Sequence, residues 1–434
     1  MTTSQVSPPV PVEPPVAPSS LGRLVFGLII SKTSLNLSLV VPLQLLLTLK
    51  LTSVLDGASA AASFGLVTGI GALVALVFNP IVGRISDATT IRFGRRRTWL
   101  LFGATTGGFA LAGVGMATEV WHVVVLWSLV QWLFNFQQIA TDALFADQVE
   151  VRRQGRVAGV LGLPGLLGPL IGLSLVSTVQ AGSAGQWYLL TAVAVSAGVT
   201  SVFLVRDVPA DRVSRPPVDV RSMLRTFWID PRRHPAFAWA WLVRFLNCCA
   251  IATVAFTGVY MTDRFALDPD QVSSTILKAV LLSVTVQTLS GLCSGYFSDK
   301  LRRQKPFVAV AGLFAATGTM GVAFAPSYEF VFLAIGVQAI GFGTFIAVDF
   351  ALCVRLLPNP ADAGKDLGVL DLATSLPQSI VPLLGVVLLP LGGFPLFYGT
   401  LVVVGFIGMA ALLRVPEIGD EEHGGRWSVP VVRG

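Results

Sequence analysis

Residues 80–87 read Pro-Ile-Val-Gly-Arg-Ile-Ser-Asp, and residues 92–97 read Arg-Phe-Gly-Arg-Arg-Arg. This charged stretch lies between two long apolar segments. A thinner copy, Gly-Tyr-Phe-Ser-Asp-Lys at residues 295–300, lies 212 positions later when Asp87 is matched to Asp299. A charged turn that recurs half a chain away indicates a membrane protein built from two similar halves, the plan of many secondary transporters.

The composition of the 434-residue chain points to the same class. Charged residues make up only 12% of it, hydrophobic residues 53%, and the mean hydropathy is +0.74. A soluble domain carries about 25% charged residues, whereas apolar segments of about 20 residues cross a bilayer as helices. We therefore expect an all-α membrane protein with two pseudo-symmetric halves of six transmembrane helices each, at residues 24–48, 61–83, 98–117, 120–146, 157–179, 187–205, 237–260, 271–297, 306–325, 328–353, 367–390 and 394–413.

The segments outside these helices complete the expected domain plan. Residues 1–20 are rich in Pro and Ser and predict a disordered cytoplasmic tail, followed by an N-terminal half at 21–205. A cytoplasmic linker at 206–236 leads to the C-terminal half at 237–414 and a cytoplasmic tail at 415–434. Five apolar residues of the linker share one helical face and predict an amphipathic helix under the membrane surface: Val220, Met223, Leu224, Phe227 and Trp228.

The distribution of positive charge predicts the orientation. With the N-terminus in the cytoplasm, 25 of the 30 Lys and Arg residues fall in cytoplasmic segments and only two, Lys50 and Arg264, in outward loops. This asymmetry satisfies the positive-inside rule, so we expect a multi-pass protein of the cell membrane with both termini cytoplasmic. The net charge of +6 then reflects loops beside anionic lipid, and no nucleic-acid partner is expected. The duplicated fold encloses a path by itself, which predicts a monomer.

The sequence contains no motif of an enzyme or a metal protein. It lacks nucleophile-elbow, P-loop, zinc-protease and dinucleotide-binding signatures. The four cysteines form no Cys-x-x-Cys pair, which argues against a zinc site or a disulfide framework. We expect no enzymatic activity, no metal and no cofactor, and we interpret the cysteines as small apolar residues: Cys248, Cys249, Cys293 and Cys353.

Two further repeats support an internal duplication. Residues 155–163, Gly-Arg-Val-Ala-Gly-Val-Leu-Gly-Leu, match residues 364–372, Gly-Lys-Asp-Leu-Gly-Val-Leu-Asp-Leu, at six positions. Asp-Ala-Leu at residues 142–144 resembles Asp-Phe-Ala-Leu at residues 349–352, and each lies near the end of its segment. Chance similarity between apolar helices would not give three near-equal offsets in the same order.

These motifs carry a family resemblance. Over nearly its whole length the chain resembles the major facilitator superfamily and, within it, the glycoside-pentoside-hexuronide and sucrose-transporter branch. That branch carries Pro-x-x-Gly-x-x-Ser-Asp followed by Arg-Phe-Gly-Arg-Arg-Arg. Asn135, Gln138 and residues 143–147 also follow the sucrose-carrier pattern Asn-x-x-Gln-x-x-x-Arg-Ala-Leu-x-Ala-Asp. The resemblance implies the major facilitator fold, alternating access and a sugar solute, with Asp87 helping to hold the cytoplasmic side closed.

The chain departs from that branch at two positions. Asp142 stands where sucrose carriers have Arg, and Trp132 stands where they have Asp. The second segment also lacks the carboxylates that melibiose-type sodium symporters use. The resemblance therefore supports a sugar solute more strongly than a sodium site.

Polar residues inside the membrane are rare and usually functional. Six of the predicted helices carry one interior charge each (Lys32, Asp142, Arg244, Lys278, Asp349, Asp371), whereas the third, sixth, ninth and twelfth carry none, as expected of lipid-facing helices. Amides line one face of the fourth helix, and an amide both donates and accepts hydrogen bonds, as sugar hydroxyls do. We predict a solute cavity lined by Lys32, Asn36, Gln131, Asn135, Gln138, Trp241, Arg244, Asn247 and Gln338.

Asp142 and, second, Asp349 are candidates for proton coupling, because the proton affinity of a carboxylate changes when a cationic partner moves. Both residues, with Asp371, lie near the cytoplasmic helix ends, so salt bridges of a gate remain an alternative role. A third alternative is that the three interior cations and three carboxylates neutralise one another. We predict that a cytoplasmic gate contains Gly83, Asp87, Gly94, Arg95, Arg96, Arg97, Asp147, Asp299 and Asp371.

The sequence thus predicts a secondary active transporter that moves a small polar solute, a sugar or glycoside, by alternating access with protons. One alternative is an exporter of small amphipathic compounds or a lysolipid carrier of the same fold, which a more apolar cavity would favour. Another is a non-transporting membrane sensor or enzyme. The expected partners are a small-molecule solute, protons and the lipid bilayer.

Overall fold

The computed structural model describes residues 20–55, 57–89, 91, 93–149, 157, 160–207, 231–265, 267–301, 303–355 and 363–415. In these ranges all regular structure is helical. The elements are α1 (Leu21–Val41), η1 (a π-helix, Pro42–Leu46), α2 (Leu47–Thr52), α3 (Gly57–Ala88), α4 (Arg95–Met116), α5 (Val120–Gln148), α7 (Leu163–Val176), α8 (Ala184–Leu204), α10 (Pro235–Ile251), η2 (a 3₁₀-helix, Ala252–Phe256), α11 (Thr257–Phe265), α12 (Pro269–Leu301), α13 (Lys305–Ala323), α14 (Tyr328–Arg355) and α15 (Ala363–Leu412).

These elements are consistent with twelve membrane segments. Ten helical stretches of the described residues are long and apolar enough to cross a bilayer. One of them contains two helices, because α15 bends at Gly392 and Gly393, where Gly393 has a φ of +62°. The apolar helix α7, 14 residues long, is the remaining segment. The predicted fold class is confirmed. The predicted amphipathic helix at 219–228 lies outside the described residues.

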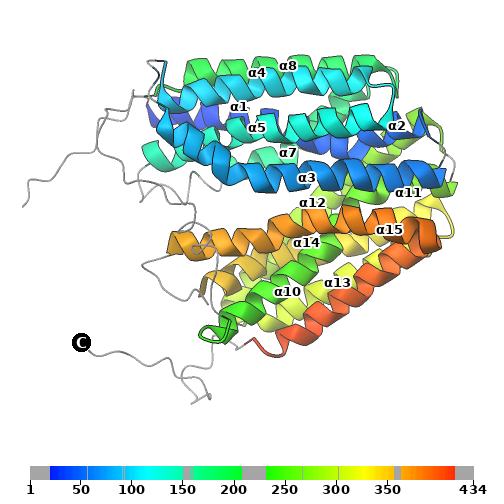
Figure 1. The fold of residues 1–434 in the computed structure, drawn as a ribbon. Helices are drawn as coiled ribbons and strands as arrows, with labels where there is room; N and C mark the ends of the chain where they lie inside the picture. The colour runs from blue at the N-terminus through cyan, green and yellow to red at the C-terminus, as the bar shows by residue number, and fades with distance from the viewer. Residues whose placement is uncertain are drawn as a thin grey trace, which may run out of the picture.

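The helices form two groups, α1 to α8 and α10 to α15, which Figure 1 shows as an upper and a lower bundle. The main contacts between the groups join α3 to α15 and to α11, and α7 to α12, and η1 also touches η2. The helices α4, α8 and α13, which are the third, sixth and ninth segments, pack mainly within their own group. This is the arrangement that the absence of charge in those segments predicts.

The two groups are packed together at only one end. We call the end where α3 ends and α4 begins the basic end. At the opposite end, one buried apolar cluster includes Phe64 and Trp127 of the first group with Phe256, Tyr260 and Tyr398 of the second. Near the basic end, each group has its own separate cluster, and the two bundles diverge there in Figure 1. The two groups therefore share a buried apolar core at the end opposite the basic end, which we call the closed end, and the described residues give them no shared core at the basic end.

Aromatic rings build the closed end. The rings of Phe64 on α3 and Phe256 on η2 meet edge to face, with centroids 5.1 Å apart, and so join the two groups. The ring of Phe256 also packs against the ring of Phe397, with centroids 4.7 Å apart. Tyr260 packs against Tyr398 at 5.6 Å. Edge-to-face aromatic contacts add to the stabilisation from burial itself.

Close helix packing within the first group depends on Gly103. A Cβ atom at this position would lie 2.5 Å from the backbone nitrogen of Gln137 and 2.9 Å from the carbonyl oxygen of Leu133. We predict that Gly103→Ala lowers the free energy of unfolding by about 1–3 kcal/mol, because α4 and α5 must separate. Thermal unfolding in detergent measures this effect. Gly399→Ala, where nothing lies within 4 Å, is the control; equal melting temperatures for the two variants would contradict the prediction.

Candidate functional site

An ion pair joins the first and fourth helices of the N-terminal group. Lys32 Nζ on α1 lies 2.7 Å from Asp142 Oδ1 on α5. Gln138, one turn before Asp142 on α5, donates from Nε2 to Asp142 Oδ2 at 2.6 Å. The side chains of Lys32 and Asp142 are 21% and 51% exposed. Three sequence-predicted residues therefore form one polar cluster that is partly exposed.

A second ion pair occupies the equivalent position of the C-terminal group. Arg244 Nη1 on α10 lies 2.6 Å from Asp349 Oδ2 on α14, and the two side chains are only 14% and 2% exposed. Arg244 Nε also donates to Thr374 Oγ1 at 3.0 Å. The sulfhydryl of Cys353 donates to Asp349 Oδ1 at 3.8 Å. This carboxylate is thus held by two helices and covered from solvent.

The two pairs are related by the internal repeat. Both join the first and fourth helices of a group, and Asp142 and Asp349 begin the matched sequences noted above. Four of the six interior charges therefore neutralise one another in pairs, as the third alternative expected. The pairs differ in exposure, because the side chain of Asp142 is half-exposed whereas that of Asp349 is buried.

Two other amides of the α5 face contact α3 instead of Asp142. Asn135 Nδ2 donates to the carbonyl oxygen of Ala75 at 3.1 Å. The side chain of Gln131 packs at Gly71, where an added Cβ would lie 3.3 Å from its Cγ. On α1, Asn36 Nδ2 donates to the carbonyl oxygen of Lys32 at 2.8 Å. The predicted amide-bearing face of α5 is thus divided. Gln138 contacts Asp142, whereas Gln131 and Asn135 contact α3.

The remaining predicted solute residues lie in the C-terminal group. Trp241 stacks on Phe245 with centroids 5.4 Å apart, and its Nε1 donates to the carbonyl oxygen of Val369 at 2.8 Å. Asn247 is buried and donates to its own helix, at the carbonyl oxygen of Val243. The buried amide of Gln338 donates to Thr319 Oγ1 at 2.9 Å. Of these residues, Gln338 also lines the pocket described next.

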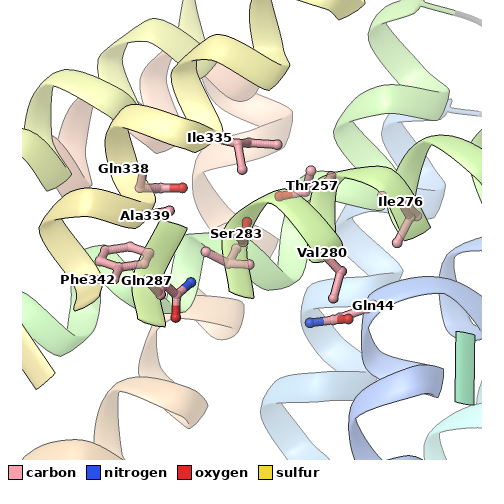
Figure 2. A pocket seen from close by; sticks show the side chains of 13 residues that line it. Gln44, Thr257, Ile276, Val280, Ser283, Gln287, Ile335, Gln338, Ala339 and Phe342 are labelled. Carbon is pink, nitrogen blue, oxygen red and sulfur yellow. The ribbon is translucent and has the colours of Figure 1, made fainter. Parts of the chain in front are cut away.

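A small pocket lies between η1, η2, α11, α12 and α14. Figure 2 shows Gln287 and Gln338 on one side of it and Gln44 on the other, with Ser283 between them. The sequence analysis missed Gln44, Ser283 and Gln287. The available signal was their position as isolated polar residues within long apolar runs, with Ser283 and Gln287 one helical turn apart.

The predicted gate residues form contacts within the N-terminal group. Arg95 Nη2 and Arg96 Nε lie 2.8 Å and 3.2 Å from Asp147 Oδ2, and Arg96 Nη1 donates to Ser86 Oγ at 2.9 Å. Gly83 faces open space, since nothing lies within 4 Å of an added Cβ. The side chains of three predicted gate residues lie outside the described part of the structure: Asp87, Asp299 and Asp371.

Asp207, which the sequence analysis did not single out, caps α4. Its Oδ2 accepts hydrogen bonds from the backbone nitrogens of Arg96 and Arg97, the latter at 3.2 Å. The preceding Gly94 has a φ of +118°, which favours glycine, and an added Cβ there would lie 2.8 Å from the same carboxylate oxygen. A carboxylate at a helix N-terminus satisfies free N–H groups and interacts favourably with the helix dipole.

With this geometry described, comparison with known proteins decides the family. The sequence profile of the Major Facilitator Superfamily matches residues 21–280 and 240–432, nearly the whole chain. The chain belongs to this superfamily. It is thus a multi-pass membrane protein and a transporter, not an enzyme. Comparison with curated protein sequences finds no significant match.

Solved structures of other superfamily transporters share the fold. A bacterial homologue of the human lysosomal transporter Spinster, in an inward-facing and unoccupied conformation, has a TM-score of 0.69 at 14% identity, covering 91% of this chain and 97% of that one. The nucleoside transporter NupG has a TM-score of 0.67 at 16% identity, covering 90% of this chain and 98% of that one. The human organic anion transporter MFSD10 (TETRAN) has a TM-score of 0.63 at 16% identity, covering 90% of this chain and 99% of that one.

The cap at α4 gives a stability prediction. We expect Asp207→Ala to lower the free energy of unfolding by about 0.5–2 kcal/mol, because two backbone donors of α4 lose their acceptor. Asp207→Asn, whose amide oxygen still accepts, retains most of the stability. Thermal unfolding in detergent tests this, with Asp263→Ala at an exposed position as the control. The role of the cap is refuted if Asp207→Ala and Asp263→Ala melt at the same temperature.

The unequal exposure of the ion pairs gives a second stability prediction. Asp349→Ala leaves a buried arginine without its carboxylate and costs about 3–5 kcal/mol. Asp142→Ala removes the partner of a more exposed lysine and costs about 0–1 kcal/mol. Chemical denaturation of the two purified variants compares these losses. A larger loss for Asp142→Ala would show that exposure does not govern the energetics of these pairs.

Proposed function

We propose that this protein is a secondary active transporter of the glycoside-pentoside-hexuronide or sucrose-transporter type. It moves a small polar solute, a sugar or glycoside, by alternating access together with protons. The basic end faces the cytoplasm, which places both termini there and makes the described conformation inward-open. The proposal assigns the protein to the cell membrane as a monomer.

The observation that carries the proposal is the cluster of Lys32, Gln138 and Asp142. Asp142 is half-exposed, and it contacts a cation and an amide at hydrogen-bonding distance. A solute hydroxyl that replaces Gln138 or Lys32 as partner changes the proton affinity of this carboxylate. Solute binding and proton binding are then linked at one side chain. Asp349 is the second proton-coupling candidate. Because it is buried, the C-terminal group must change conformation before this carboxylate exchanges protons with solvent.

The other predicted solute ligands take supporting roles in this proposal. Trp241 and Arg244 lie on α10, which is the counterpart of α1 in the second group. There Arg244 pairs with Asp349, and Trp241 stacks on Phe245. Asn36, Gln131, Asn135 and Asn247 hydrogen-bond or pack within their own group, so they position the helices that carry the cluster. The amide of Gln138 beside Asp142 is the group in this cluster that favours a polyhydroxylated solute over an amphipathic export substrate.

The gate proposal follows from the open basic end. Arg95 and Arg96 pair with Asp147 at the basic end. When the basic end closes, the α3–α4 turn approaches the C-terminal group, with Asp87, Asp299 and Asp371 as the carboxylates that exchange basic partners. Gly83 and Gly94 allow this approach.

Proton coupling is tested by recording the pH of weakly buffered medium around de-energised cells that express the protein. One sugar or glycoside from a panel of mono- and disaccharides should make the medium more alkaline as protons enter with it. Asp142→Asn should abolish this signal while it leaves the protein at the membrane, and the exposed Asp263→Asn should retain it.

Three outcomes would contradict this proposal. Alkalinisation that persists in Asp142→Asn would remove Asp142 from the proton pathway. Uptake of a labelled sugar without any change of pH would indicate uniport. Expulsion of preloaded organic anions, with no response to any sugar, would favour the exporter instead.

A further inference from the structure

A ring of buried hydrogen bonds lies beside the pair of Lys32 and Asp142. Ser31 on α1 and Thr141 on α5 directly precede the two charged residues, and their hydroxyl oxygens are 2.7 Å apart. Both side chains are fully buried, as is that of Gln137, one turn before Thr141 on α5. Neighbouring residues of a helix point about 100° apart. The contact between α1 and α5 therefore has a covered side with the hydroxyls and a partly exposed side with the ion pair.

The hydrogens of this ring have one consistent arrangement. The Thr141 hydroxyl donates to the carbonyl oxygen of Gln137 at 2.7 Å, so the Thr141 oxygen accepts from the Ser31 hydroxyl. The Ser31 hydroxyl oxygen in turn accepts from Gln137 Nε2 at 3.2 Å. The same Nε2 lies 3.3 Å from the carbonyl oxygen of Ser31. Linked hydrogen bonds strengthen one another in a buried site, so the ring fixes Ser31 against one turn of α5.

The internal repeat shows that packing alone does not require these hydroxyls. In the second group of helices, the residues that precede the two members of the ion pair are Val243 and Val348. Both are 1% exposed and belong to one buried apolar cluster. Valine thus fills the position that Thr141 occupies in the first group, and the two side chains have nearly the same size and shape.

The two groups therefore hold these helices in register by different contacts. In the second group Arg244 donates to both Asp349 and Thr374, on two helices, and its planar guanidinium fixes the geometry. Within the described residues, Lys32 Nζ bonds to Asp142 alone. A single contact between a flexible lysine and a half-exposed carboxylate holds two helices only weakly. In the first group the register of α1 against α5 thus depends on the buried ring.

We propose that Ser31, Gln137 and Thr141 are positioning residues that keep Lys32 within reach of Asp142 while this ion pair opens and re-forms. The inference rests on the proposed function for the part that the pair plays in proton coupling, but the positioning itself involves no solute. When the carboxylate exchanges its partner, the ring keeps α1 in place and the lysine stays nearby. Without the ring, α1 shifts along α5, and the lysine has less influence on the proton affinity of the carboxylate.

Other charged residues on the helices packed against α5, which are α1, α3 and α4, stand near the basic end. The side chains of Arg84 and Asp87 on α3 lie outside the described part of the structure. The remaining ones hydrogen-bond or pair with groups other than Asp142: Arg23, Arg95, Arg96 and Arg97. Among the described side chains, Lys32 is therefore the cation whose distance from Asp142 the ring controls.

The purified full-length protein in detergent tests this proposal through the labelling of Asp142 by a carbodiimide, which reacts with the protonated carboxyl group. Peptide mass spectrometry measures the labelling rate across a pH series, and the midpoint pH reports the proton affinity of the carboxyl group. Lys32→Ala gives the midpoint in the absence of the lysine. Thr141→Val and Ser31→Ala should each move the midpoint toward that of Lys32→Ala by about half a pH unit, a roughly threefold change in proton affinity.

Two variants separate positioning from packing. Thr141→Ser keeps the hydroxyl and should retain the midpoint of the unmodified protein. Thr68→Val on α3 removes another buried threonine hydroxyl, which donates within its own helix to the carbonyl oxygen of Phe64 at 2.7 Å, and it should also leave the midpoint unchanged. Thr141→Val should fold, because valine occupies the equivalent position in the second group. Thermal unfolding in detergent checks this.

Three results would overturn the proposal. Thr141→Val and Ser31→Ala would both keep the midpoint of the unmodified protein, Thr68→Val would shift it as much as they do, or Lys32→Ala would not shift it, which leaves the ring no ion pair to hold.

The labelling experiment involves neither sugar nor transport, so it is separate from the test of the proposed function. The expected shifts without sugar-driven alkalinisation would refute the proposed function alone. Alkalinisation that requires Asp142, without these shifts, would refute the positioning role alone.

Discussion

The aromatic contact between Phe64 and Phe256 holds together two groups of helices that otherwise separate toward the basic end. Lipid surrounds such a bundle with a medium as apolar as its own side chains, so close packing and not exclusion from water joins the helices. The largest shared packing surface therefore decides which end is closed. In this conformation that surface combines the contact of α3 with α15 and the aromatic cluster, and the ion pairs and the α3–α4 turn lie outside it.

The ion pairs show how a duplicated chain assigns different tasks to equivalent positions. Lys32–Asp142 and Arg244–Asp349 join corresponding helices, yet one carboxylate is half-exposed and the other is buried. Arginine offers several donors in a fixed plane, which suits a pair held between Thr374 and a second helix. Lysine carries a compact charge with three rotatable donors, so its pair has a less fixed geometry. The arginine thus belongs to the buried pair and the lysine to the more exposed one.

Much of the fold could be predicted from the sequence, because apolar segments of membrane length, basic turns and internal repeats are local signals. The pairing of charges was only one of three alternatives, because side-chain partners depend on helix rotation, and rotation depends on packing. Asn247 shows this limit: it lies one turn from Arg244, yet it bonds within its own helix. Asp207 and Gln44 were missed for a related reason, since a cap contributed by a distant helix and a π-turn leave no mark in local sequence periodicity.

The connections at the closed end are very short. They comprise residues 53–56, 117–119, 177–183, 266–268, 324–327 and 392–393, so the longest has seven residues. A protease needs several residues of extended chain in its cleft, and an antibody needs a protruding surface. The described connections at the closed end therefore offer a protease or an antibody very little extended chain to bind, so limited proteolysis from that side would leave the helices intact.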